Sequence, residues 1–160
     1  MMKVFDAVLF DCDGVLVDSE PITNGVLQVM LSELGWRMTA RECFATFVGH
    51  AVIDQAPLIK VGLLDYFAGR TFSGIEQPRN KPQPDVYLTA AKALGVPIQR
   101  CAVVEDTPNG ARAGVAAGAI VFGYVPTDGF SDNTVALQAV GVRRFFGDMM
   151  DLPDLLATVA

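Results

Sequence analysis

The sequence lacks the features that mark several large classes of protein. Its 160 residues contain one histidine, one tryptophan and three cysteines, and none of the cysteines (Cys12, Cys43 and Cys101) forms a CxxC pair. An odd number of scattered cysteines does not build a disulfide framework, which favours free thiols in a reducing cytoplasm. No apolar run approaches the roughly 20 residues that cross a bilayer, and no signal-peptide pattern opens the chain. We therefore expect a cytoplasmic protein with no membrane partner.

Basic residues are also scarce. Twelve Lys and Arg face eighteen Asp and Glu, which gives a formal net charge of −6. This is the wrong sign for a protein that must neutralise the phosphates of a nucleic acid, so we expect no nucleic acid partner. Apolar residues are plentiful at 51%, against 19% charged residues. This composition supplies a core for about one globular domain and argues against intrinsic disorder.

Short apolar runs alternate with helical patterns along the chain. Prolines suited to a first helical turn precede several helical segments, and glycines follow them as stop signals. The alternation predicts an α/β fold with a doubly wound parallel sheet, which binds ligands at the carboxyl ends of its strands. The expected strands are Val4–Phe10, Arg70–Ser73, Cys101–Val104, Ile120–Tyr124 and Phe145–Phe146, and the expected helices are Pro21–Gly35, Thr39 to about Thr46, Pro84 to before Gly95, Pro108–Gly118, Asn133–Val140 and a C-terminal helix.

Four acidic residues fall at the tips of two predicted strands. Asp11 and Asp13 follow the first strand, and Glu105 and Asp106 follow the strand that begins at Cys101. Clustered carboxylates stay ionised only when a cation or a basic side chain compensates them. Carboxylate oxygens are ligands that suit Mg²⁺. This ion takes few protein ligands, so its remaining coordination positions can accept phosphate oxygens. Lys81, in a loop before a predicted helix, could reach the same edge, so the pattern predicts an anion site built from Mg²⁺ and a lysine.

Simpler interpretations apply to the same residues. Paired acids in turns are commonly solvated loop residues or helix caps. Glu105 and Asp106 could favour the N-terminus of the helix that begins at Pro108, an effect of about 0.3–1 kcal/mol. The single histidine, His50, has no partner in sequence, and we expect a structural role for it.

Three segments resemble, in the correct order, three of the four motifs of the haloacid dehalogenase superfamily. They are FDCDGVLVDSE at 10–20, KPQPDVY at 81–87 and VEDTPNG at 104–110. Within that superfamily they are similar to the small-molecule phosphatases and the β-phosphoglucomutase-like enzymes. The resemblance implies a Rossmann-like core and a small phosphorylated metabolite as partner.

The resemblance also implies a role for each acidic residue and for the lysine. Asp11 would be the nucleophile that forms an aspartyl-phosphate, Asp13 the general acid and base, and Lys81 the group that steadies the phosphoryl charge. Asp106, assisted by Glu105, would hold Mg²⁺ together with the Asp11 carboxylate and the Asp13 backbone carbonyl.

The implied activity is Mg²⁺-dependent hydrolysis of small phosphomonoesters of the sugar phosphate or phosphoglycolate type. A β-phosphoglucomutase-like phosphomutase is the first alternative, because it would use the same site. A catalytically impaired remnant of the core that only binds is an alternative of another class. A signalling receiver domain fits less well, because its lysine comes last in the chain, whereas Lys81 precedes Glu105 and Asp106.

The chain departs from the superfamily pattern in one region. The strand ending in Ser or Thr and most of the helical cap are missing, and the resemblance divides the chain into core (1–18), partial cap (19–59) and remaining core (60–160). We expect several tens of residues to be absent near Ile59–Lys60. An engineered deletion, a naturally degenerate gene and a mobile cap left out of the consecutive numbering would each explain this. We favour the last, because excising a core strand should damage folding.

Overall fold

The computed structural model describes residues 4–18, 28–29, 31–33, 35–39, 42, 62–127 and 132–158. Contacts divide the chain into two compact units, one formed by residues 1–11 and 67–160 and the other by residues 12–66. His50, Cys43 and the junction Ile59–Lys60 lie outside the described residues, as does most of the expected cap at 19–59. The expectations for them therefore stay predictions. No helix among the described residues is long and apolar enough to cross a membrane.

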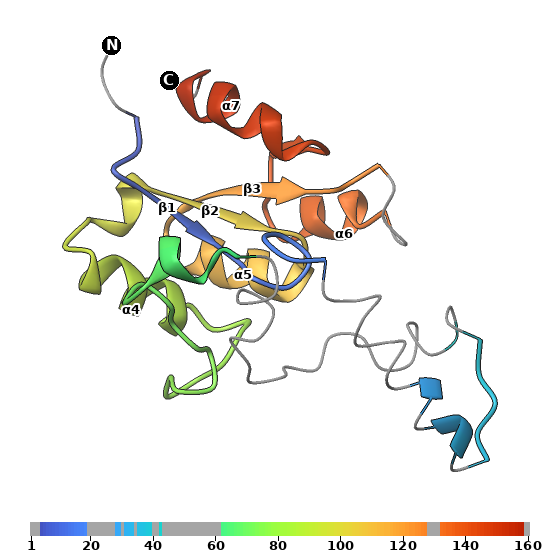
Figure 1. Cartoon of the computed structure of the whole chain (residues 1–160). Helices are drawn as coiled ribbons and strands as arrows, with labels where there is room; N and C mark the ends of the chain where they lie inside the picture. Colours follow the sequence, from blue (N-terminus) through green and yellow to red (C-terminus); the bar gives the residue numbers. More distant parts are fainter. Residues whose placement is uncertain are drawn as a thin grey trace. The chain divides into compact units, whose positions relative to one another are not determined.

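The first unit is built on a parallel sheet of four strands in the order β1-β2-β3-β4 (Figure 1). Strand β2 is buried at every position, as expected of an interior strand in a parallel sheet. It pairs with its two neighbours in a register that aligns Phe10 with Val104 on one side and Val104 with Phe122 on the other. The strands are β1 (Ala7–Phe10), β2 (Cys101–Glu105), β3 (Ile120–Tyr124) and β4 (Arg144–Phe146).

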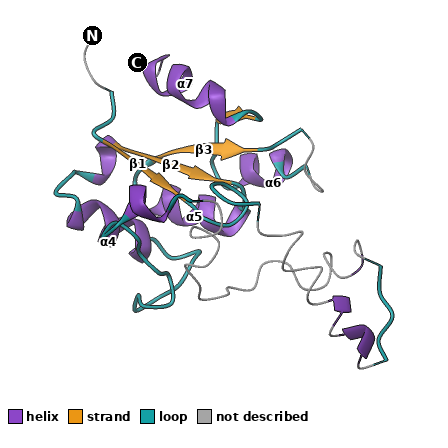
Figure 2. Cartoon of the chain, in the orientation of Figure 1, coloured by secondary structure: helices purple, strands orange, loops and turns teal. Residues whose placement is uncertain are grey.

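Helices cover both sides of this sheet. Figure 1 shows α4 and α5 below the strands and α7 above them, and Figure 2 separates helices from strands by colour. The predicted α/β fold with a parallel sheet is thus confirmed. The helices are α4 (Asp85–Ala93), α5 (Pro108–Ala117), α6 (Thr134–Ala139) and α7 (Leu152–Thr158), with 3₁₀ turns η1 (Leu64–Phe67), η2 (Ile98–Arg100) and η3 (Met149–Asp151).

The ends of α4 and α5 follow the proline and glycine signals. Pro84 directly precedes α4, and Pro108 is the first residue of α5. Thr107 caps α5, because its hydroxyl oxygen accepts a hydrogen bond from the Gly110 amide at 3.2 Å. Gly118 ends α5 with a φ of 90°, a conformation that glycine adopts without a steric penalty. These predicted boundaries are confirmed.

The predicted strand at Arg70–Ser73 is wrong. These residues pair with no strand in the described part of the chain. Arg70 donates its amide hydrogen to the Phe67 carbonyl, and the Ser73 carbonyl accepts from the Gln77 side chain at 3.1 Å. Local turns therefore use polar groups that a strand ladder would need. Phe72, the one apolar residue of this segment, still packs against the core.

The structure of the second unit also contains two features that the sequence predicts, a helix end at Gly35 and a helix N-cap at Thr39. Gly35 has a φ of 86°, and the amide of Trp36 donates to the Leu31 carbonyl at 2.8 Å, the pattern of a helix end. Thr39 and Glu42 form a capping box, since each side chain accepts a hydrogen bond from the other residue's amide. The predicted helix stop and N-cap are confirmed.

Small residues allow α5 to lie close to the sheet. A Cβ atom on Gly114 would stand 2.9 Å from Val121 Cγ2 and 3.0 Å from Val103 Cγ1. Such distances are shorter than ordinary van der Waals contact, so only a glycine permits this approach. The close packing places the second turn of α5 against β2 and β3.

We predict that Gly114→Ala lowers the free energy of unfolding by about 1–3 kcal/mol, because the new methyl group overpacks the interface between helix and sheet. Alanine is the better helix former by about 0.5–1 kcal/mol, so a loss would have to come from packing. Urea unfolding measures the change, and Ala116→Ser at an exposed position of the same helix should stay within about 0.5 kcal/mol of the wild type. Equal or greater stability of Gly114→Ala would contradict the close packing.

Candidate active site

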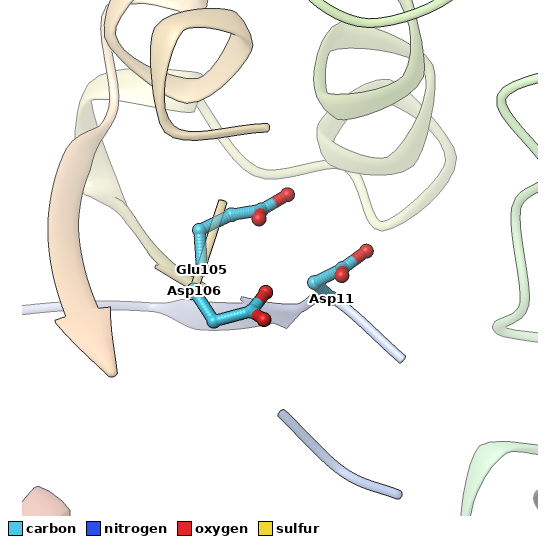
Figure 3. Close-up of side chains that lie close together, drawn as sticks. All are labelled: Asp11, Glu105 and Asp106. Atoms are coloured by element: carbon cyan, nitrogen blue, oxygen red, sulfur yellow. The ribbon is translucent and has the colours of Figure 1, made fainter. Parts of the chain in front are cut away.

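Three carboxylates meet at the carboxyl ends of β1 and β2 (Figure 3). Asp11 directly follows β1, and its amide donates to the Val104 carbonyl at 2.9 Å, which extends the parallel ladder by one residue. Glu105 is the last residue of β2, and Asp106 follows it. Oxygen atoms of all three side chains lie within 4.8 Å of one another. The structure therefore brings together three of the predicted site residues.

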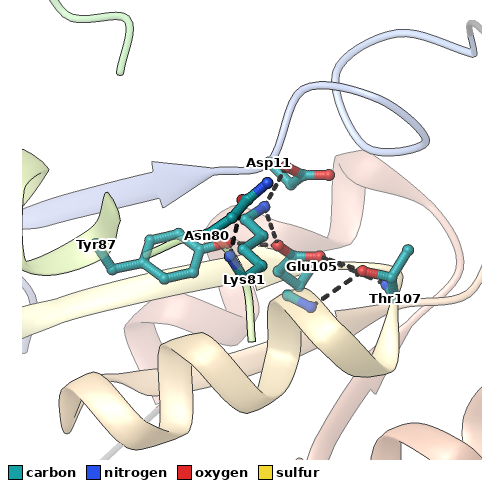
Figure 4. A network of polar contacts seen from close by, with 7 residues as sticks. Asp11, Asn80, Lys81, Tyr87, Glu105 and Thr107 are labelled. Atoms are coloured by element: carbon teal, nitrogen blue, oxygen red, sulfur yellow. Dashed lines mark hydrogen bonds and ion pairs between the residues drawn. The ribbon is translucent and has the colours of Figure 1, made fainter. Parts of the chain in front are cut away.

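Lys81 supplies a positive charge to this cluster. Its Nζ atom donates to Asp11 Oδ1 and to Glu105 Oε1, each at 2.6 Å (Figure 4). Burial by itself lowers the pKa of Lys81, but the negative charges of Glu105 and Asp11 and the hydrogen bonds to them outweigh it, so the pKa is raised. The ammonium is consequently protonated at neutral pH. It is shared by carboxylates from two strands.

The Glu105 carboxylate is fully buried and has donors on both oxygens. Besides Lys81, the Tyr87 hydroxyl donates to Oε1 at 2.5 Å. The Thr107 amide and hydroxyl donate to Oε2 at 3.5 and 3.2 Å. Burial raises the pKa of Glu105, as does the charge of Asp11, whereas Lys81 and Tyr87 act in the opposite direction. Sequence reasoning missed Tyr87 and Thr107 as partners, although both stand in the motif segments at 81–87 and 104–110.

Gly110 provides the space that this carboxylate occupies. A Cβ atom at Gly110 would lie 1.8 Å from Glu105 Oε1 and 2.2 Å from Oε2. Any other residue would thus collide with the carboxylate unless the side chain or the helix moved. Sequence reasoning also missed the role of Gly110. The sequence feature that could have indicated this role is the position of the glycine in the first turn of the helix that begins at Pro108.

Asp13 lies in the second unit, where the chain makes a tight turn. The carbonyl of Cys12 accepts hydrogen bonds from the amides of Leu16 and Val17 at 3.0 Å, and Gly14 has a φ of 80°. Asp13 is exposed and forms an isolated bridge with Val17. Its role as general acid and base stays a prediction.

The three clustered carboxylates suit a hard divalent cation. Asp11, Glu105 and Asp106 offer oxygen donors, which Mg²⁺ and similar ions prefer over nitrogen or sulfur. Three negative charges within 4.8 Å repel one another, and one ammonium offsets only part of that repulsion. A bound cation would reduce the remainder, so the donor set and its charge both fit a metal.

The comparisons with known proteins agree with this site. A family model described as haloacid dehalogenase-like hydrolase matches residues 37–118, about half of the chain. The chain belongs to this family. The matched region contains the motif segments at 81–87 and 104–110, with Lys81, Glu105 and Asp106, so the resemblance to this family is confirmed.

Named relatives of this haloacid dehalogenase-like hydrolase include phosphatases and mutases. The 6-phosphogluconate phosphatase of Escherichia coli K12 is 28% identical over 183 residues, which cover 76% of this chain and 83% of that protein. A β-phosphoglucomutase of Mycobacterium tuberculosis is 37% identical over 99 residues, which cover 58% of this chain but 36% of the mutase. A family hydrolase of Deinococcus radiodurans, crystallised with bound phosphate and sodium, has a TM-score of 0.70 and 27% identity, with 98% of this chain and 96% of that chain covered.

The alignment with the E. coli phosphatase also shows a difference in length. It runs over 183 residues but takes in 76% of this hydrolase, or about 122 residues, so about 60 positions of the phosphatase have no counterpart. This difference has the size expected for the segment absent near Ile59–Lys60. The location of the gap stays a prediction.

We predict that Gly110→Ala lowers the free energy of unfolding by about 1–3 kcal/mol, because a methyl group would displace the Glu105 carboxylate from its donors. It should also weaken the binding of a divalent cation, which calorimetric titration with Mg²⁺ measures. Asn109→Ala, an exposed change in the same helical turn, is the control and should alter neither property. Unchanged stability and cation affinity in Gly110→Ala would show that Glu105 does not need this space.

Proposed function

We propose that this hydrolase is a Mg²⁺-dependent phosphatase of small phosphomonoesters that acts through an aspartyl-phosphate on Asp11. The observation that carries the proposal is the position of the Lys81 ammonium, 2.6 Å from an oxygen of Asp11 in a cluster with two further carboxylates. A nucleophilic carboxylate, an ammonium and metal-binding oxygens are the groups that phosphoryl transfer requires. A sugar phosphate or phosphoglycolate is the substrate class that we propose, and the 6-phosphogluconate phosphatase relative supports it.

The chemistry divides ester hydrolysis into two displacements. In the first, a carboxylate oxygen of Asp11 bonds to phosphorus, the bond from phosphorus to the ester oxygen breaks, and the departing alcohol takes a proton from Asp13. In the second, water gives a proton to Asp13 and attacks the aspartyl-phosphate, which releases inorganic phosphate and restores the Asp11 carboxylate. Each acidic side chain ends in the protonation state in which it began.

Lys81 stabilises negative charge on the transferring group. Its raised pKa keeps the ammonium protonated, and its position beside Asp11 puts that charge next to the attacking carboxylate. Glu105 holds the other side of the ammonium. A Mg²⁺ ion held by Asp11, Glu105 and Asp106 would supply further positive charge to the phosphoryl oxygens.

We predict that Asp11→Asn lowers the rate of phosphate release by at least about 1000-fold, because an amide is a poor nucleophile and cannot form the aspartyl-phosphate. Release of inorganic phosphate from a panel of phosphate esters measures the activity. Asp151→Asn, the same chemical change at an exposed position, should keep the wild-type rate. Full turnover by Asp11→Asn would remove Asp11 as the nucleophile.

The same panel separates the alternatives. Release of phosphate with no isomerised product supports the phosphatase. The mutase alternative, favoured by the similarity to β-phosphoglucomutase, predicts an isomeric phosphate ester as the main product. A chain that binds Mg²⁺ but hydrolyses every ester poorly would be the impaired remnant of the core.

We also predict that Mg²⁺ raises the midpoint of thermal unfolding, because the ion binds the folded carboxylate cluster and not the unfolded chain. At a concentration 100 times the dissociation constant, such binding stabilises by about 2.7 kcal/mol. The shift should disappear in Asp106→Asn, and EDTA should abolish phosphate release by the wild type. An unfolding midpoint that is the same in EDTA and in Mg²⁺ would contradict a metal site at these residues.

A further inference from the structure

Tyr87 contacts both members of the ion pair at the centre of the site (Figure 4). It lies in the first turn of α4 and is 4% exposed. Its hydroxyl donates to Glu105 Oε1 at 2.5 Å, and Lys81 Nζ lies 5.3 Å from the centre of its ring. One side chain thus forms a hydrogen bond with the anion and a cation–π contact with the ammonium.

The hydroxyl completes the set of donors around Glu105. Oε1 accepts from Lys81 and Tyr87, while Oε2 accepts from the amide and hydroxyl of Thr107. Donors on both oxygens therefore restrain the rotation of the carboxylate. Because Tyr87 and Thr107 belong to different elements, they hold the carboxylate from two directions.

The Tyr87 hydroxyl also adds no charge to a site that already contains several charged side chains. A tyrosine hydroxyl is uncharged at neutral pH, so it donates to the Glu105 carboxylate without adding a second positive charge. A second ammonium at this position would compete with Lys81 for Glu105. A neutral donor instead stabilises the Glu105 anion and leaves it paired with Lys81.

We propose that Tyr87 is a positioning residue of this active site, which holds Glu105 with its hydroxyl and Lys81 with its ring so that Lys81 Nζ stays on Asp11. A phenylalanine would fill almost the same buried volume, so filling the core does not account for the hydroxyl. The expected effect on catalysis rests on the proposed function. The expected effect on the position of Lys81 does not.

The test compares Tyr87→Phe with Tyr66→Phe, the same chemical change at a tyrosine that is 75% exposed. In Tyr87→Phe, kcat for phosphate release should fall about tenfold while KM changes less than about twofold, since loss of a group that orients a site residue costs about 10–100-fold. Tyr66→Phe should match the wild type in both constants. Circular dichroism verifies that each variant is folded.

A second measurement follows Lys81 directly and does not depend on activity. The exchange of its ammonium protons with water, observed by ¹H–¹⁵N NMR and assigned by the loss of the signal in Lys81→Met, should become about threefold faster in Tyr87→Phe. Lys92, which is exposed on α4, the helix that contains Tyr87, is the reference within each sample. If the wild type releases no phosphate, the proposed function fails, but this measurement still tests the positioning role.

A double-mutant comparison separates positioning from general damage. If Tyr87 acts through Lys81, Tyr87→Phe should cost no further activity in the Lys81→Met background. Tyr87→Met, which lacks both ring and hydroxyl, replaces the phenylalanine variant if that variant does not fold. Wild-type exchange of the Lys81 protons together with wild-type kcat in Tyr87→Phe would overturn the proposal, as would an equal loss of activity in both backgrounds.

Discussion

The Lys81 ammonium between Asp11 and Glu105 is the contact on which the rest of the site depends. The parallel register aligns Phe10 with Val104, so the residues that follow them are forced to lie side by side. Two like charges 4 Å apart repel by about 4 kcal/mol at an effective dielectric constant of 20. Because backbone pairing fixes their separation, a positive charge is needed to keep both carboxylates ionised. The loop before α4 brings that charge to the end of the sheet.

The position of α5 determines both the packing of the sheet and the hydrogen bonds of the Glu105 carboxylate. Gly114 lets the helix approach β2 and β3, and Gly110 leaves room for the Glu105 carboxylate above the first turn. The same turn begins at Thr107, whose amide and hydroxyl reach Glu105 Oε2. A shift of the helix would therefore move donors of the carboxylate as well as core side chains.

The sequence predicted the features that depend on local rules. Prolines and glycines marked the ends of α4 and α5, and acidic residues after apolar runs marked the strand tips. The prediction of a strand at Arg70–Ser73 was wrong, because turn hydrogen bonds compete with strand pairing there. Tyr87 and Gly110 were missed for another reason. Helical periodicity shows which face of a helix is buried, but it does not show which side chain of another element that face meets.

The proposed chemistry is one that both phosphatases and phosphomutases could use, and relatives of both kinds are similar to this chain. In the proposed mechanism, Asp11, Lys81, Glu105 and Asp106 all act on the phosphoryl group or on its metal ion, so none of them would distinguish one sugar from another. Hydrolysis and mutase chemistry share the transfer of phosphoryl to an aspartate and differ in the acceptor of the second step, which is water or the substrate. Selection between them must therefore depend on residues that admit or exclude water. The proposed phosphoryl site could therefore stay constant while those residues change.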